Sequence, residues 1–174
     1  MKLKSWYNNV LKVDFIYKVN LTNSYKIPTI KKVCINICSK FIIEYPKRIF
    51  YYITAIKLVT NTNPKICKSE KSISSLKLRK GMIIGLKLSL KNVFVYDFMY
   101  LFIMLIIPNL KSSNKYNIEN KGKCMSIGVD NLLQYPQLDN KFTKNVKAVV
   151  NLNITNTNIT LSKILLSGMQ LPQK

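Results

Sequence analysis

Polar side chains recur at every second position of three otherwise apolar segments, residues 32–38, 86–91 and 147–155. The outward positions include Lys32, Asn36, Lys87, Ser89, Lys91, Lys147, Asn151 and Asn153, together with Cys34, Cys38, Val149 and Thr155, and none of them is an acid. Lysine ammonium groups neutralise phosphates, and neutral amides and hydroxyls bond to 2′-hydroxyls and base edges. The pattern therefore predicts an RNA-binding surface. The alternative is a solvated face that lacks acids through codon bias, which explains abundant lysine and asparagine but less easily three segments without any acid.

A second basic segment spans residues 65–91. Its cations are Lys65, Lys68, Lys71, Lys77, Arg79, Lys80, Lys87 and Lys91, and Glu70 is its one acid. The sequence GMIIG at residues 81–85 places three apolar residues between two glycines, and glycines favour turns. We expect a basic hairpin whose apolar tip meets a nucleic-acid surface. The alternative is a tip that folds back on the core.

Catalytic and metal-binding chemistry find no support in the residue types. The chain has no histidine, its seven carboxylates are scattered, and no phosphate-binding loop or dinucleotide motif occurs. The four cysteines form no C-x-x-C pair: Cys34, Cys38, Cys67 and Cys124. We therefore expect reduced, mostly buried thiols, no metal site, no cofactor and no enzymatic activity.

Strands and helices that would position these residues follow from hydrophobic periodicity. Alternation with a period of two predicts strands at 32–38, 86–91, 124–129 and 147–155. Helical spacing predicts helices at 2–19, 47–59, 93–107 and 159–167. Asn92 and Asn158 stand where helix N-caps are expected, and Gly168 follows the last helix.

The fold class follows from the two faces of these strands. One face is aliphatic and requires helices to cover it, whereas the other is polar. We expect an α+β fold, with an antiparallel sheet, helices packed on one face and an open RNA-binding face. The whole of residues 1–174 should form a single domain, in which residues 109–123 form one long polar loop.

The apolar run VFVYDFMYLFIMLII, residues 93–107, has two interpretations. As a helix it would be about 22 Å long, which is short of a bilayer core of about 30 Å. Asp97 also interrupts it. A buried core helix is therefore favoured over a membrane span.

Composition defines the class of partner. The formal charge is +21, from 28 basic and 7 acidic residues, and 48% of residues are hydrophobic. The chain is too apolar to be disordered, and its charge indicates a polyanion, either nucleic acid or an anionic membrane surface. Abundant Lys, Asn, Ile and Tyr are typical of an AT-rich genome. Together with the lack of a recognisable signal or transit peptide, this favours a protein encoded within an organelle.

Several segments resemble, in the family's order, the 5S-rRNA-binding ribosomal protein L-five of the large subunit. They are YKIPTIKKVCINIC (25–38), NPKICKSEKSISSLKLRKGMIIGLKLSLKN (63–92), IPNL (107–110), GKCMSIGV (122–129), YPQLD (135–139) and the ending NITLSKILLSGMQLP. The resemblance covers the chain from about Leu3 to Pro172. Its lysine-rich style is similar to members encoded in protist mitochondria.

The resemblance implies a fold and a set of partners. The family has an antiparallel sheet backed by helices, is not catalytic, and anchors 5S rRNA in the central protuberance, where it touches the peptidyl-site tRNA. The implied partners are 5S rRNA or a 5S-like RNA, large-subunit rRNA, peptidyl-site tRNA, a small-subunit head protein across the subunit bridge, and other central-protuberance proteins. The implied location is the mitochondrial matrix.

The family's polar residues that bind 5S rRNA fall here on Asn36, Thr62 and Ser89. Thr62 stands where glutamine is usual, and Ser89 stands where threonine is usual. With the lysines of the polar face, the predicted RNA-binding residues are Lys32, Asn36, Thr62, Lys87, Ser89 and Lys91. The family's tRNA-contacting loop falls on residues 74–85 and includes Lys77, Arg79, Lys80, Gly81, Met82, Ile83, Ile84 and Gly85.

Two other functions compete with the ribosomal one. The first is an organellar RNA-binding factor outside the ribosome, which would not sediment with the large subunit. The second is a basic peripheral membrane protein that uses its charge and the helix at 93–107. High salt with magnesium chelation would release a ribosomal protein but would leave a spanning helix in the membrane.

Overall fold

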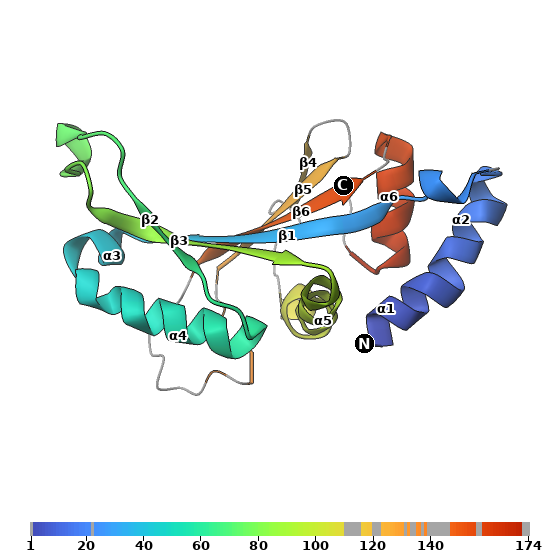
Figure 1. The fold of residues 1–174 in the computed structure, drawn as a ribbon, viewed down its shortest axis with the longest axis horizontal. Helices are drawn as coiled ribbons and strands as arrows, with labels where there is room; N and C mark the ends of the chain where they lie inside the picture. Colours follow the sequence, from blue (N-terminus) through green and yellow to red (C-terminus); the bar gives the residue numbers. More distant parts are fainter. Residues whose placement is uncertain are drawn as a thin grey trace.

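The computed structural model describes residues 2–21, 23–109, 116–119, 123–130, 132, 135–136, 138, 147–155 and 158–171 (Figure 1). The strands are β1 (Thr29–Cys38), β2 (Lys65–Lys68), β3 (Ile83–Lys91), β4 (Tyr116–Glu119), β5 (Cys124–Val129) and β6 (Ala148–Thr155). The longer helices are α1 (Lys2–Trp6), α2 (Lys12–Val19), α3 (Lys40–Glu44), α4 (Ile49–Thr60), α5 (Val93–Leu101) and α6 (Ile159–Gly168). The short helical turns are η1 (Tyr7–Leu11), η2 (Ser24–Lys26), η3 (Pro46–Arg48), η4 (Ser74–Leu76), η5 (Phe102–Ile106) and η6 (Ile107–Asn109).

The six strands form one sheet in the order β2-β3-β1-β6-β5-β4, with every neighbouring pair antiparallel. Strand β1 lies between β3 and β6, so Val33 stands opposite Leu90 on one side and Leu152 on the other. All three side chains are buried. The period-two alternation therefore produces one aliphatic face, as predicted, and the α+β fold class is confirmed.

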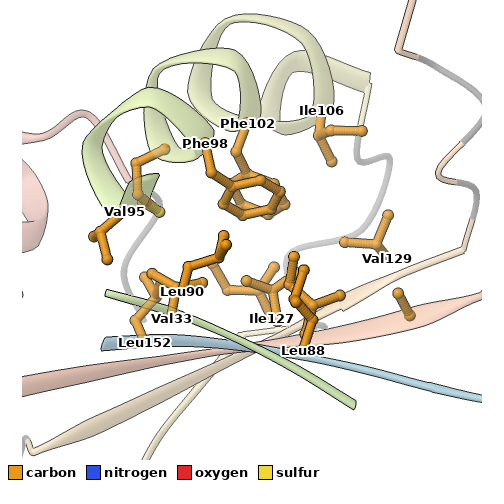
Figure 2. Packing of buried hydrophobic residues seen from close by; sticks show 14 of the residues in the cluster. Val33, Leu88, Leu90, Val95, Phe98, Phe102, Ile106, Ile127, Val129 and Leu152 are labelled. Carbon is orange, nitrogen blue, oxygen red and sulfur yellow. The ribbon is translucent and has the colours of Figure 1, made fainter. Parts of the chain in front are cut away.

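Helix α5 and its continuation η5 pack across this aliphatic face (Figure 2). Val95, Phe98, Phe102 and Ile106 recur at helical spacing and point at the sheet, and all four are buried. The rings of Phe98 and Phe102 stack with their centroids 5.6 Å apart. Because the apolar side of this helix faces the sheet, the run is explained as core. Within the described residues, no helix has the length and apolar character to cross a bilayer.

The N-terminal helix is continuous from α1 through the π-helical turn η1 to α2, as predicted for residues 2–19. It buries Tyr7, Leu11 and Phe15 at four-residue spacing. The Tyr7 hydroxyl donates a 2.7 Å hydrogen bond to the Pro28 carbonyl. Burial, and then repulsion from Tyr96, raise the pKa of Tyr7, so this hydroxyl remains a donor at neutral pH.

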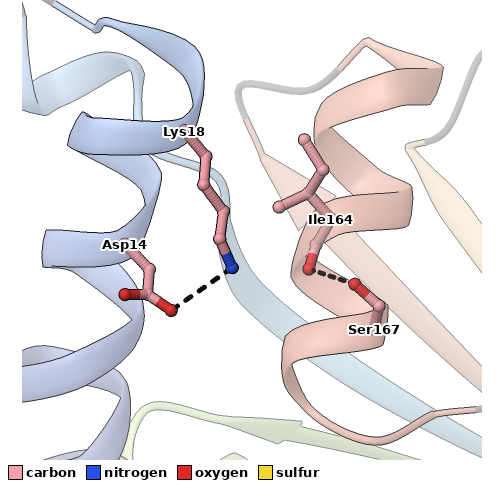
Figure 3. A network of polar contacts seen from close by, with 4 residues as sticks. All are labelled: Asp14, Lys18, Ile164 and Ser167. Carbon is pink, nitrogen blue, oxygen red and sulfur yellow. Dashed lines mark hydrogen bonds and ion pairs between the residues drawn. The ribbon is translucent and has the colours of Figure 1, made fainter.

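Helices α2 and α6 lie next to each other at the end of the sheet opposite the β2–β3 hairpin (Figure 1). Leu11 packs so closely on Gly168 that a side chain there would touch it. Two polar contacts in this region lie within one helix each: Lys18 pairs with Asp14 at 3.5 Å, and the Ser167 hydroxyl donates to the Ile164 carbonyl at 2.9 Å (Figure 3). The close approach of Leu11, in η1, to Gly168 is an apolar contact between the N-terminal helix and α6.

Three local predictions are wrong. The segment 109–123 is not one loop, because β4 lies within it and pairs with β5. Asn92 makes no side-chain cap and instead adopts a positive φ of 54° before α5. Gly168 is the last residue of α6, and the left-handed conformation falls on Gln170, with φ of 58°.

The apolar tip predicted at residues 81–85 is also wrong. Gly81 lies in a turn, with φ of +88°, but Ile83, Ile84 and Gly85 belong to β3. Gly85 stands opposite Cys38 of β1 and Cys67 of β2, well inside the sheet. The two glycines therefore do different things: the first permits a turn, and the second permits a close approach of two strands.

We predict that Gly85→Ala destabilises the fold by about 3 kcal/mol, because the added Cβ would collide with the backbone carbonyl oxygen of Ile37. Gly81→Ala is the matched control. Its Cβ would meet open space, so only left-handed strain of about 1–2 kcal/mol is expected. Urea unfolding of both variants measures the difference, and equal losses would contradict this account of Gly85.

Candidate RNA-binding surface

The polar face of the sheet, here called the open face, is defined by cross-strand register. One row runs Lys91, Lys32, Asn153 and Cys124. The next row runs Ser89, Cys34, Asn151 and Ser126. A third row runs Lys65, Lys87, Asn36, Val149 and Gly128.

Five of the six predicted RNA-binding residues lie together on this face. Lys32 stands directly opposite Lys91, and Asn36 stands directly opposite Lys87, while Ser89 lies between the two lysines of β3. The lysines of β3 and Ser89 are exposed, and Lys32 and Asn36 are half-buried. The structure thus brings together groups that are far apart in sequence.

Thr62 is the exception. It lies in the connection between α4 and β2, outside every strand. Its hydroxyl is 3.1 Å from the hydroxyl of Thr60, the last residue of α4. Thr62 is therefore not part of the open face, although it precedes Lys65 of β2 by only three residues.

Lysines face each other across the strands of the open face. Lys32 opposes Lys91, and Lys65 opposes Lys87. Like charges directly opposite one another destabilise a sheet. No acid offsets them on the three longest strands, since β1, β3 and β6 contain neither Asp nor Glu. An anionic partner would relieve this repulsion, so the face is electrostatically suited to phosphates.

Between the lysines, a shallow concavity holds neutral polar groups. It is lined by Lys32, Cys34, Asn36, Lys87, Cys124, Ser126, Asn151 and Asn153. The Cys34 thiol lies 3.7 Å from the Ser89 hydroxyl, and the Cys124 thiol donates to Asn153 Oδ1 at 3.4 Å. Asn151 Oδ1 is buried and has no hydrogen-bond partner in the described part of the chain. The centre of the face therefore retains an unused acceptor.

The sequence prediction did not assign three open-face contributors as binding residues. Cys34 was placed on the polar face but treated only as a reduced, mostly buried thiol, and Ser126 and Cys124 belong to β5, whose alternation is weaker in the sequence. The buried positions of β5 are Met125, Ile127 and Val129, so the alternate ones face outward. Pairing of β5 with β6 places them in the polar rows.

The β2–β3 hairpin extends beyond the body of the sheet and ends in η4 (Figure 1). Backbone hydrogen bonds join the two ends of the loop at the tip of the hairpin. Ser69 N–H donates to the Met82 carbonyl and Gly81 N–H donates to the Ser69 carbonyl, each at 2.8 Å. Ile73 and Leu78 pair inside it through two backbone hydrogen bonds. The loop, residues 69–82, is therefore closed at its neck.

The exposed surface of this loop differs from the predicted tip. Lys77, Arg79 and Lys80 are exposed, as a nucleic-acid contact requires. The apolar side chain that projects most is Leu76, at 61% exposure, rather than Met82, which is half-buried and receives the Arg79 N–H on its sulfur. Ile83 packs against the core.

The described residues contain no group of three side chains able to hold a metal ion, and their four cysteines are free thiols.

No protein-family model matches the chain. It is 30% identical to large ribosomal subunit protein uL5m of Reclinomonas americana, over 98% of this chain and 97% of that protein. It is also 30% identical to uL5 of Buchnera aphidicola, over 92% of this chain and 89% of that protein, and to uL5 of Thermosipho africanus, over 78% and 76%. The chain therefore belongs to the uL5 family, the structural and non-catalytic proteins of the large ribosomal subunit.

Proposed function

We propose that the open face binds 5S rRNA, or a 5S-like RNA, and so anchors it in the central protuberance of a mitochondrial large subunit. The observation that carries this proposal is the pair of lysine–lysine oppositions on a sheet whose three longest strands contain no acid. Phosphates placed between the opposed lysines would replace repulsion by attraction. Membership of the uL5 family supports rRNA as the source of those phosphates.

Neutral groups of the same face are suited to recognition beyond charge. Asn36 and Ser89 offer amide and hydroxyl groups, and the buried Asn151 acceptor lacks a partner. Hydroxyl donors are what the minor groove of an RNA helix presents, through its 2′-hydroxyls. The face carries no stacking aromatic on these rows, so shape and backbone recognition fit better than base stacking.

The mitochondrial assignment rests on composition together with the relatives. Lysine accounts for nearly all of the basic residues, and only Arg48 and Arg79 are arginine. This is typical of an AT-rich organelle genome. The match to uL5m of Reclinomonas americana over nearly the whole chain supports the same assignment.

The hairpin loop 69–82 is the part proposed to contact peptidyl-site tRNA. Its projection beyond the sheet and its exposed Lys77, Arg79 and Lys80 support a contact with a second RNA (Figure 1). Leu76, together with Ile73, takes the place that the sequence prediction gave to residues 82–84. The subunit bridge and contacts with other central-protuberance proteins belong to the same proposal through family membership.

Salt dependence tests the lysine contacts. Replacing Lys87 or Lys91 by alanine should each reduce the slope of log affinity against log salt by about 1, because one phosphate contact and its counterion release are lost. The slope is obtained by measuring the affinity for a 5S-type transcript at KCl concentrations from about 50 to about 300 mM. Lys4→Ala, an exposed lysine on α1, is the control and should leave the slope unchanged. Unchanged slopes for both strand variants would assign these lysines to solvent.

The hairpin proposal predicts a defect confined to tRNA. Ile73→Ser combined with Leu76→Ser removes the exposed apolar surface of the loop, and it should change the free energy of unfolding by less than about 1 kcal/mol. Retention of peptidyl-site tRNA on reconstituted subunits should fall, while 5S-type RNA binding stays normal. Val13→Ser, a half-exposed apolar residue on α2, is the control. Normal tRNA retention in the loop variant would reject the contact.

A further inference from the structure

Aromatic side chains that the core does not use gather on the helical side of the sheet, at α3 and the start of α4. Phe41 and Tyr45 are 49% and 57% exposed, and Phe50 and Tyr51 are 68% and 65% exposed. Exposed apolar groups that cluster in this way mark interaction sites. We call these four residues, with Arg48 and the neighbouring lysines 40, 47 and 57, the aromatic–basic surface.

Helix α4 shows how the surface arises. One side of the helix is buried against the sheet and carries Ile49, Tyr52, Ala55, Ile56 and Thr60. The opposite side is exposed and carries Phe50, Tyr51, Thr54, Lys57 and Leu58, and exposed Lys47 precedes it in η3. A solvated helix face would be largely polar. Here the outer face carries two exposed rings and Leu58 with one lysine, Lys57, and the helix contains no acid.

Arg48 joins α3 to this face. Its guanidinium carbon lies 4.4 Å from the ring centroid of Tyr45 and 5.8 Å from that of Phe41. The rings hold the guanidinium and leave it half-exposed. Aromatic rings and guanidinium planes are the platforms on which unpaired bases stack.

The net positive charge of the aromatic–basic surface indicates which class of partner it binds. Between residues 39 and 62 there are four cations and one acid, Glu44. Glu44 lies 3.7 Å from the Lys40 ammonium, so its charge is already compensated. A polyanion is therefore favoured. Lysine is depleted from protein–protein interfaces, whereas lysines interleaved with exposed rings suit a strand that offers both phosphates and bases.

We propose that the aromatic–basic surface binds an unpaired RNA segment, whose bases stack on Phe50 and Tyr51 and whose phosphates lie near Lys47 and Lys57. Helices α3 and α4 lie on the aliphatic side of the sheet, away from the open face (Figure 1). The protein then holds two RNA segments, one on each side. This inference is independent of the open-face proposal, since it uses other residues and another mode of recognition.

The test uses the full-length protein and a fluorescein-labelled 12-mer of uridine, in a background of Lys87→Ala with Lys91→Ala that weakens the open face. Adding Phe50→Ala and Tyr51→Ala should reduce affinity at least about tenfold, through the loss of stacking. Tyr17→Ala with Tyr25→Ala removes two rings that are 77% and 87% exposed elsewhere, and it should change affinity less than twofold. Tyr51→Phe keeps a ring and should bind like the parent. Unchanged thermal midpoints confirm that the variants fold.

Photo-crosslinking with a 4-thiouridine 12-mer locates the contact. Crosslinks within residues 41–58 support the proposal. Crosslinks confined to the strands, or equal affinity of the Phe50/Tyr51 double variant, would overturn it. If that variant binds RNA normally but assembled subunits lose a neighbouring protein, the surface binds protein and the proposal fails. The open-face proposal is tested separately, because it depends on the slopes of Lys87→Ala and Lys91→Ala with a 5S-type transcript.

Discussion

Alternation in the central strand β1 from Lys32 to Cys38, after a register shift between Ile30 and Lys32, is the constraint on which the rest of the molecule depends. Val33, Ile35 and Ile37 are all buried on one side, while Lys32 and Asn36 face the other. Because β1 pairs with both β3 and β6, a slip of one residue would move lysine and asparagine into the core. Register is therefore fixed by burial, and the same register aligns the polar rows. The surface proposed to bind RNA is in this sense a by-product of core packing.

The aliphatic face of the sheet stabilises the free protein, whereas the open face lowers its stability. On the aliphatic face, α5 contributes stacked rings and branched side chains that close the core (Figure 2). On the open face, opposed lysines and an unpartnered Asn151 acceptor subtract from the stability of the free protein. Charge that is unfavourable alone becomes favourable against phosphate. A uL5 protein of this composition should accordingly be more stable in its ribonucleoprotein than in isolation.

Sequence patterns predicted β1 and β6 from their alternation and α5 from a long apolar run that Pro108 ends, and the N-terminal helix was also predicted. They failed where the local structure of a segment depends on its pairing with strands that are distant in the sequence. Strand β4 has four residues and exists through its pairing with β5, so its local pattern is too short to detect. Gly85 looks like a turn residue in sequence but is required inside the sheet by the approach of Ile37. The exposed rings of α4 were hidden because this helix is apolar on both sides, and periodicity alone does not show which side the sheet covers.

The central claim, that RNA covers the open face, is tested most directly by thiol protection with the chain's own cysteines. Cys38 is exposed at the end of β1, and Cys124 is half-buried within the polar rows. Single-cysteine variants, and a Ser167→Cys control on α6 in a cysteine-free chain, would be alkylated with and without a 5S-type transcript. The account predicts that RNA slows alkylation of Cys38 and Cys124 by about tenfold or more, as for occlusion by a specific complex, and leaves the α6 thiol unaffected. Unchanged rates at the two strand cysteines, with RNA shown to be bound, would contradict it.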